Sequence, residues 1–336
     1  MTPRTVDLLN IGLMLASLAA AFALPFELFL FSYAVLGPLH YLTEISWLGE
    51  RNFFTRGKRD WIPLAGLTLL VLFSNDYIVG RWHIVPLAPY WPQLTCAAFA
   101  LAFVFAIVPG RVERVVGAIA IAVFVTAFAG VGARGWLLFG MFVTTILHVC
   151  VFTGAFMLFG ALKSRSRTGY AATALLVVCS LVALFAPAHA SEAVSTYVSK
   201  SYASFHVMNT ELARVLGFGT TPPGSTVPFA SYRDLLTSGP GIAIQRFIAF
   251  AYTYHYLNWF SKTSIIRWHQ VDRRKLAFAS VVWIASLALY ASSYDLGARW
   301  LFLLSFAHVL LEFPLNHLSF VGIGQELTAR MRAGRL

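Results

Sequence analysis

Two short segments of the chain each place a histidine and a glutamate four residues apart. GPLHYLTEISW, residues 37–47, carries His40 and Glu44, and FAHVLLEFP, residues 306–314, carries His308 and Glu312. Residues four apart lie on one face of an α-helix, so each pair points an imidazole and a carboxylate in the same direction. These two groups together are ligands of non-haem iron, and they also suit zinc, manganese and copper. The spacing therefore predicts metal binding.

The composition places this chemistry in a membrane protein. Of the 336 residues, 58% are apolar and only 12% are charged, and the mean hydropathy is +0.71, whereas about a quarter of the residues of a soluble domain are charged. Apolar runs of about 20 residues, each long enough to cross a bilayer, recur along the chain. Glu44 and Glu312 are the only two acidic residues well inside such runs. Because a carboxylate there costs about 3 kcal/mol, its repetition beside a histidine indicates a function.

The sequence predicts an all-α, polytopic membrane bundle that forms a single transmembrane domain over residues 1–336. Most of the 25 basic residues fall on one side if both termini are cytoplasmic, which predicts an N-in, C-in topology. These basic residues lie between the spans and form no patch, so the net charge of +11 does not predict nucleic-acid binding. We expect a multi-pass protein in the lipid bilayer of a bacterial inner (cytoplasmic) membrane. Ten spans are expected, at residues 8–24, 26–48, 62–79, 92–109, 115–131, 136–162, 170–187, 241–261, 276–292 and 299–321.

The longest connection, residues 188–240, is expected on the outer side. Its first part has apolar residues at helical spacing, which predicts an amphipathic helix lying on the membrane surface. Two interpretations of this connection are open. It is either a plain external cap on the bundle or a lid over an entry for lipids. The apolar face consists of Val198, Tyr202, Phe205, Met208, Leu212 and Val215.

Four histidines are expected at one depth. His40, His148, His255 and His308 lie about nine to fourteen residues into the second, sixth, eighth and tenth spans. All four spans run from the outer to the inner side, and at 1.5 Å per residue the depths agree to within about 8 Å. A layer of imidazoles on parallel helices predicts one shared site.

Further polar residues lie beside this layer. Glu44, Glu312 and Asn258 lie about one turn deeper on the same helical faces. Tyr252 and Tyr256 flank His255 nearly on its own face, which makes them candidates for hydrogen bonds to the ligands. We therefore expect Tyr252, Tyr256 and Asn258 as catalytic residues, with His40, Glu44, His148, His255, His308 and Glu312 as metal ligands.

Structural interpretations compete with this one. A single histidine in a span often makes only an interhelical hydrogen bond, and His317, beside Asn316, is the one most expected to do so. His206 and Glu211 are alternatively a local pair on the amphipathic helix. Four histidines at one depth with two embedded carboxylates favour a site of one or two metal ions. The three cysteines lie in separate apolar segments, which predicts neither a disulfide nor a thiolate site.

Two segments are similar to the bacterial Brp/Blh-type β-carotene dioxygenases, which are polytopic membrane non-haem iron oxygenases. GPLHYLTE resembles a family segment in which a Gly/Pro-flanked histidine precedes an acidic residue by four positions, and FAYTYHYLNWF resembles an aromatic-rich stretch before a later histidine. The resemblance implies a metal-dependent oxygenase. This chain has Glu44 where the family has aspartate, and it lacks the closely spaced second histidine after His255. The histidine boxes of membrane desaturases and alkane hydroxylases are missing.

These observations predict a membrane oxidoreductase, a non-haem iron oxygenase that activates O2 and acts on a lipophilic small molecule as hydroxylase, desaturase or dioxygenase. An electron donor protein is an expected partner for the reactions that need one. Zinc or copper are alternative metals. The alternative functions are a membrane haem protein for electron transfer, with histidines as axial ligands, and a metal or proton transporter.

Overall fold

The computed structural model describes residues 2–191, 194–218, 228–229, 231–262 and 273–333. These residues form helices and connecting segments with no β-strand among them, as the sequence predicts. The first half contains α1 (Pro3–Ala23), α2 (Pro25–Phe31), η1 (Ser32–Leu36), α3 (Gly37–Gly49), η2 (Asn52–Phe54), α4 (Trp61–Ser74), α5 (Asp76–Val79), η3 (Gly80–Trp82), η4 (Val85–Tyr90), α6 (Trp91–Ile107), α7 (Arg111–Ala127) and α8 (Ala133–Val143). The second half contains η5 (Leu147–Phe152), α9 (Thr153–Ser164), α10 (Arg167–Phe185), α11 (Thr196–Tyr202), η6 (Ala203–Phe205), α12 (His206–Leu216), α13 (Tyr232–Thr237), α14 (Gly239–Ser261), α16 (Arg273–Ser292) and α17 (Tyr294–Arg332).

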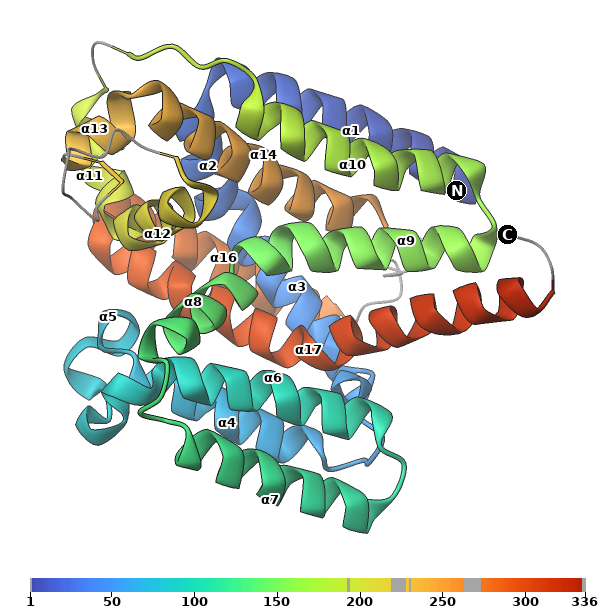
Figure 1. The fold of residues 1–336 in the computed structure, drawn as a ribbon. Helices are drawn as coiled ribbons and strands as arrows, with labels where there is room; N and C mark the ends of the chain where they lie inside the picture. The colour runs from blue at the N-terminus through green and yellow to red at the C-terminus, as the bar shows by residue number, and fades with distance from the viewer. Residues whose placement is uncertain (1, 192–193, 219–227, 230, 263–272, 334–336) are drawn as a thin grey trace.

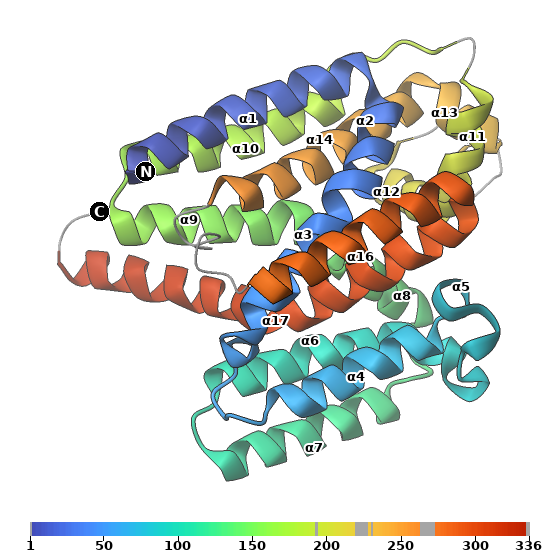
Figure 2. The ribbon, with the colours of Figure 1, turned by 180° about the vertical axis from the view of Figure 1, so that it is seen from behind.

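Four helical rods at the centre of the bundle carry the histidines and run in the same general direction (Figure 1). They are α2–η1–α3, η5–α9, α14 and α17, and they pack directly against one another. Figure 2 shows α1 and α10 covering one side of this centre, while α4, α6 and α7 form a layer on the opposite side of α17. The parallel course of the four rods is the reason that residues distant in sequence reach one level.

Helices cover all ten of the predicted spans, but three spans differ in shape from the expectation. The third span is broken, because the segment after Ser74 bends by 76° at a break before Asp76. The sixth span is interrupted between α8 and η5, where residues 144–145 form a turn. The tenth span is part of α17, which is 39 residues long and includes Pro314 in its interior. By length and composition, seven of the described helices could cross a membrane, or eight if the bent pair counts as one.

The outer surface of the bundle is apolar, as expected of a multi-pass membrane protein. Helix α7 has no buried residue at all, and it presents valine, isoleucine and phenylalanine outward. Such large apolar surfaces are rare on soluble proteins but match lipid chains. The helix α14 is the opposite case, because it is enclosed by α1, α2 and α10 and can therefore carry polar side chains. Examples of exposed apolar side chains are Val115, Ile119, Val123, Val178, Leu181, Phe278, Val281 and Ile284.

The amphipathic segment of the long connection is helical but packs differently from the prediction. It consists of α11, η6 and α12, and its apolar side chains from Val198 to Leu212 are buried against the protein's own core, not against a membrane surface. Val215 does not belong to this face, because 56% of its surface is exposed. Phe205, in the middle of the segment, packs edge-on against Phe29 and Tyr33 of the α2–η1 rod. The segment therefore covers one end of the central rods.

The turn from α16 to α17 requires a glycine, which gives a test of the packing that positions α17. A Cβ atom at Gly297 would lie 2.5 Å from the Cα atom of Tyr290, whereas nothing lies within 4 Å of a Cβ atom at Gly324. We expect Gly297→Ala to lower the free energy of unfolding by about 1–3 kcal/mol through overpacking. Gly324→Ala, in the same helix, should raise it by up to about 1 kcal/mol through helix propensity. Denaturant unfolding in detergent measures both, and equal effects of the two variants would contradict this packing.

Candidate metal centre

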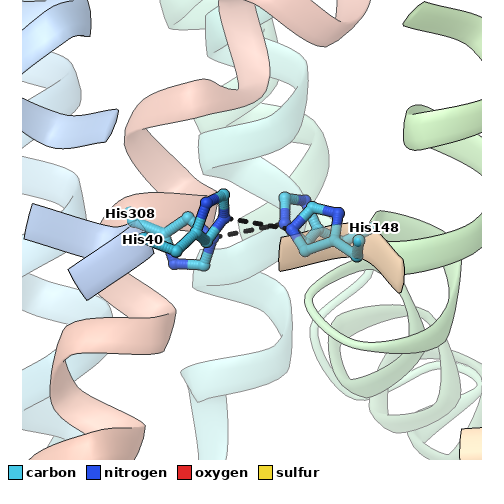
Figure 3. Close-up of side chains that lie close together, drawn as sticks. His40, His148 and His308 are labelled. Atoms are coloured by element: carbon cyan, nitrogen blue, oxygen red, sulfur yellow. Dashed lines mark hydrogen bonds between the residues drawn. The ribbon is translucent and has the colours of Figure 1, made fainter. Parts of the chain in front are cut away.

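Four buried imidazole rings form a closed ring in the middle of the bundle. The ring centroids of His40 and His255 are 4.8 Å apart, and those of His255 and His148 are 4.7 Å apart. The circle closes through His308, whose centroid lies 5.0 Å from that of His148 and 5.2 Å from that of His40. Figure 3 shows His40, His148 and His308 converging from separate rods. Each of the four side chains offers a nitrogen atom within 4.8 Å of those of the others.

The closest nitrogen pairs have the spacing of ligands on one metal ion. Nε2 of His255 lies 3.1 Å from Nε2 of His40, and Nε2 of His308 lies 3.2 Å from Nε2 of His148. Two nitrogen ligands about 2.1 Å from an ion, at the angles of octahedral or tetrahedral geometry, are about 3.0–3.4 Å apart. The paired nitrogens of the four rings thus match the edges of a coordination polyhedron.

The two glutamates complete the donor set. Oε2 of Glu44 lies 3.1 Å from Nε2 of His40, and Oε2 of Glu312 lies 3.3 Å from Nδ1 of His148. Glu44, Glu312 and His308 form a second group whose ligand atoms lie within 4.8 Å of one another. Because His308 belongs to both groups, the donors can serve one ion or two. All six predicted ligands therefore lie in one cluster.

The buried donor atoms of this cluster fit a metal ion. Glu44 is only 2% exposed, yet its Oε2 atom makes no hydrogen bond to the described residues. Oε2 of Glu312 is likewise buried and makes no hydrogen bond to any described residue. Leaving a charged acceptor unsatisfied in an apolar interior costs several kcal/mol, and a coordinated cation would remove that cost. Nitrogen and oxygen donors without a thiolate suit iron, manganese or zinc.

Irregular helix turns position two of the histidines. His148 lies within η5, a π-helical turn, and the π-helical turn η1 directly precedes α3, which carries His40. π-helical turns are rare in proteins, but those that do occur are frequently found at functional sites. Backbone hydrogen bonds in a π-helix join residues five apart, and Thr153 follows His148 by five residues at the end of this turn. Its Oγ1 atom lies 2.7 Å from Nδ1 of His255, which fixes the orientation of that imidazole and leaves Nε2 facing the cluster.

A small cavity of about 40 Å³ lies on the side of the histidines toward the C-terminal ends of the rods. The residues four positions after each histidine all line it, which are Glu44, Phe152, Trp259 and Glu312. Lys262 also lines the cavity, where its ammonium group attracts both carboxylates. Its Nζ atom lies 4.1 Å from the centroid of the Phe156 ring. One cation thus faces two anions beside the imidazole ring.

The predicted catalytic residues lie around the cluster but do not contact its donor atoms by hydrogen bonds. The Tyr256 hydroxyl is 2.5 Å from the Tyr41 hydroxyl, and the Tyr41 ring stacks on His308 with centroids 4.3 Å apart. Asn258 donates from Nδ2 to Oδ1 of Asn10 at 2.8 Å, although its side chain also lines the small cavity. Tyr252 lies one turn before His255 and packs among other aromatic rings. The sequence analysis overlooked Thr153 and Lys262.

The other two histidines considered are outside the cluster. Nε2 of His317 lies 2.8 Å from the carbonyl oxygen of Phe99, which agrees with a structural role. The predicted local pair of His206 and Glu211 does not form. Nδ1 of His206 lies 3.5 Å from Oγ1 of Thr210, while Glu211 forms ion pairs with arginines.

The first test of the site is the metal content of a histidine variant. We expect His255→Ala to lose most of the metal that the purified wild-type protein holds, because it removes one ligand and opens the imidazole ring. His317→Ala is the matched control and should retain the metal, since that ring bonds to a backbone carbonyl and packs against Phe99 and Phe103 outside the cluster. Mass spectrometry of the metal content measures both, and equal contents in two folded variants would contradict the assignment.

A second test concerns the residue that orients a ligand. Thr153→Val removes the hydrogen bond to Nδ1 of His255 and should weaken metal affinity about 10–100-fold in a chelator competition. Thr173→Val is the control, because its hydroxyl donates only to the carbonyl of Gly169 on α10. An unchanged affinity in Thr153→Val would mean that this contact does not support metal binding.

Comparisons with known proteins find no relative of this chain. No family model matches the sequence, and neither a curated protein nor a solved structure shows significant similarity to it. The buried His/Glu cluster, which could bind a metal ion, is therefore the feature of this chain that points to a function.

Proposed function

We propose that this chain is an integral membrane non-haem iron oxygenase that acts on a lipophilic substrate. The observation that carries the proposal is the buried ring of four imidazoles with two carboxylates one helical turn away. The apolar outer surface supports a substrate that arrives from the bilayer. The segment GPLHYLTE, by its resemblance to the β-carotene dioxygenases, supports the same chemistry.

The donor set favours iron among the candidate metals. Structural zinc usually has four ligands, and copper electron-transfer sites use a thiolate, whereas this cluster offers four nitrogens and two carboxylates without sulfur. Ligands of this kind, projecting inward from several helices, build iron centres in helical bundles. The sharing of His308 between two donor groups allows one or two iron ions.

Bound iron would supply the activation of O2, and the chain's residues would supply binding, orientation and proton chemistry. If both oxygen atoms enter the substrate, as in a dioxygenase, no further reductant is needed. Hydroxylation leaves one oxygen atom in the substrate and one in water, and it therefore consumes two electrons and two protons. These electrons require a donor protein, which we expect as the partner in that case. Glu44 and Glu312 are placed to hold protons beside the donor nitrogens.

The haem and transporter alternatives fit less well. Neighbouring imidazole centroids lie only 4.7–5.2 Å apart around the circle, so a porphyrin placed between any two of the rings would overlap the other two. A transport pathway needs polar groups at successive depths, whereas the two embedded acids and all embedded imidazoles except His317 gather here in one cluster. An absorption spectrum without a Soret band would separate the non-haem site from the haem alternative.

The proposal is tested by iron content and O2 uptake of the purified protein in lipid nanodiscs. We expect iron at one or two ions per chain and O2 consumption that depends on an added lipophile. It should depend on an added reductant as well if only one oxygen atom enters the substrate. Glu44→Gln should lower the rate at least about tenfold, because it changes the charge beside His40. Glu50→Gln, at an exposed position that pairs with Lys275, should leave the rate unchanged. A folded wild-type protein without iron, or with a Soret band, would overturn the proposal.

A further inference from the structure

A second, larger cavity lies on the opposite side of the histidines from the small charged one. Its volume is about 330 Å³, within the range of small-molecule sites. Three of its lining residues stand three positions before a histidine, which are Thr145, Tyr252 and Ser305. One helical turn N-terminal to the imidazoles, these residues make the floor of the cavity. The cavity thus ends at the metal centre.

The lining of this cavity excludes a charged ligand. It is formed by aromatic and aliphatic side chains with hydroxyl and amide groups between them, and none of the described residues that line it is charged. A buried carboxylate or ammonium without a partner costs several kcal/mol. The two cavities therefore differ in kind, since Glu44, Glu312 and Lys262 all line the small one. An uncharged molecule with a large apolar part fits the large one.

One polar group at the floor of the cavity lacks a partner. Tyr252 is only 6% exposed, and its hydroxyl takes part in none of the hydrogen bonds found among the described residues. The buried hydroxyl of Tyr77, farther along the lining, is also unpaired within these residues. The ring of Tyr252 is fixed edge-on against Phe29 and Tyr33, with centroids 5.3 and 5.9 Å away. Buried phenol groups usually have a hydrogen-bond partner. The oxygen atom of a ligand would satisfy this one.

The other end of the cavity meets the segment that covers the rods. Ala203, Ser204 and Phe205 of η6 line it, as do Val207 and Met208 of α12. Ala203 and Val207 are exposed, so the mouth of the cavity opens at this segment. A molecule can therefore reach Tyr252 past η6 without crossing the charged cavity.

We propose that the cavity between η6 and the histidines binds an uncharged lipophile that carries a hydroxyl or carbonyl oxygen, with this oxygen at Tyr252. The inference rests on the proposed function, because it assigns the substrate class of the same site. It selects against fatty-acid anions, which would bury a carboxylate in the uncharged floor, and against plain hydrocarbons, which would leave the Tyr252 hydroxyl unpaired. The reacting end of the ligand then lies one helical turn from the metal centre.

The test compares three probes of equal chain length: 1-dodecanol, dodecanoate and dodecane. Binding to the protein in nanodiscs is measured by the shift in tryptophan emission as an apolar probe displaces water, corrected for partition into lipid, since Trp91 lines the cavity. We expect 1-dodecanol to bind at least about fivefold more tightly than dodecane, the value of one hydrogen bond. Dodecanoate should bind at least about tenfold more weakly than the alcohol.

Single substitutions show where on the protein the probes bind. Tyr252→Phe should remove the advantage of the alcohol over the alkane, whereas Tyr170→Phe should keep it, because Tyr170 has a buried unpaired hydroxyl on α10. Ala203→Trp should weaken the binding of all three probes, because the larger side chain would close the mouth of the cavity. Equal binding of alcohol and carboxylate, or binding that neither variant changes, would overturn the inference.

Metal content is measured on the same samples and separates the two proposals. The cavity variants should retain the wild-type metal content, because none of them alters a ligand. A protein that contains no metal but binds the alcohol through Tyr252 would keep the cavity assignment as a lipophile site and overturn the oxygenase. A protein that contains iron but shows no preference for the alcohol would overturn the cavity assignment alone.

Discussion

The cost of burying charged and polar donors in an apolar bundle is the constraint on which the rest of this structure depends. Two carboxylates and four imidazoles lie in one layer, nearly inaccessible to solvent. Lys262 balances part of the negative charge, and Thr153 satisfies one imidazole nitrogen. The oxygens of Glu44 and Glu312 that face the imidazoles still lack hydrogen bonds to the described residues. A bound cation is the simplest group that would stabilise this arrangement.

The fold serves this layer by surrounding it with protein. The helix α14 carries His255 and is enclosed on most sides, so its polar residues do not meet lipid. Outer helices such as α7 and α10 provide the apolar surface instead. The central rods run in the same direction, so their histidines form one layer across the interior. A cavity lies on each side of this layer. The small charged cavity lies toward the C-terminal ends of the rods, and the large uncharged cavity lies toward their N-terminal ends.

The sequence was sufficient to predict the helical class and the grouping of the six donors, because hydropathy and the i, i+4 spacing of His40 and Glu44 are local signals. The depth argument joined His148 and His255 to them without any contact information. The contribution of Thr153 was not predictable, because the π-helical turn after Leu147 changes which residues share a face. Lys262 was in principle detectable, since it follows His255 by seven residues, which is two helical turns. The bend before Asp76 and the burial of the η6 segment depend on tertiary packing. The span count and the orientation in the membrane remain predictions.

X-ray absorption at the iron edge shows whether the four imidazoles hold iron. We expect nitrogen and oxygen ligands at about 2.0–2.2 Å with the outer-shell scattering of several imidazoles and no sulfur. In His255→Ala, that imidazole scattering should fall or the iron signal should disappear. Iron without imidazole scattering, iron bound to sulfur, or a folded protein without iron would contradict this expectation.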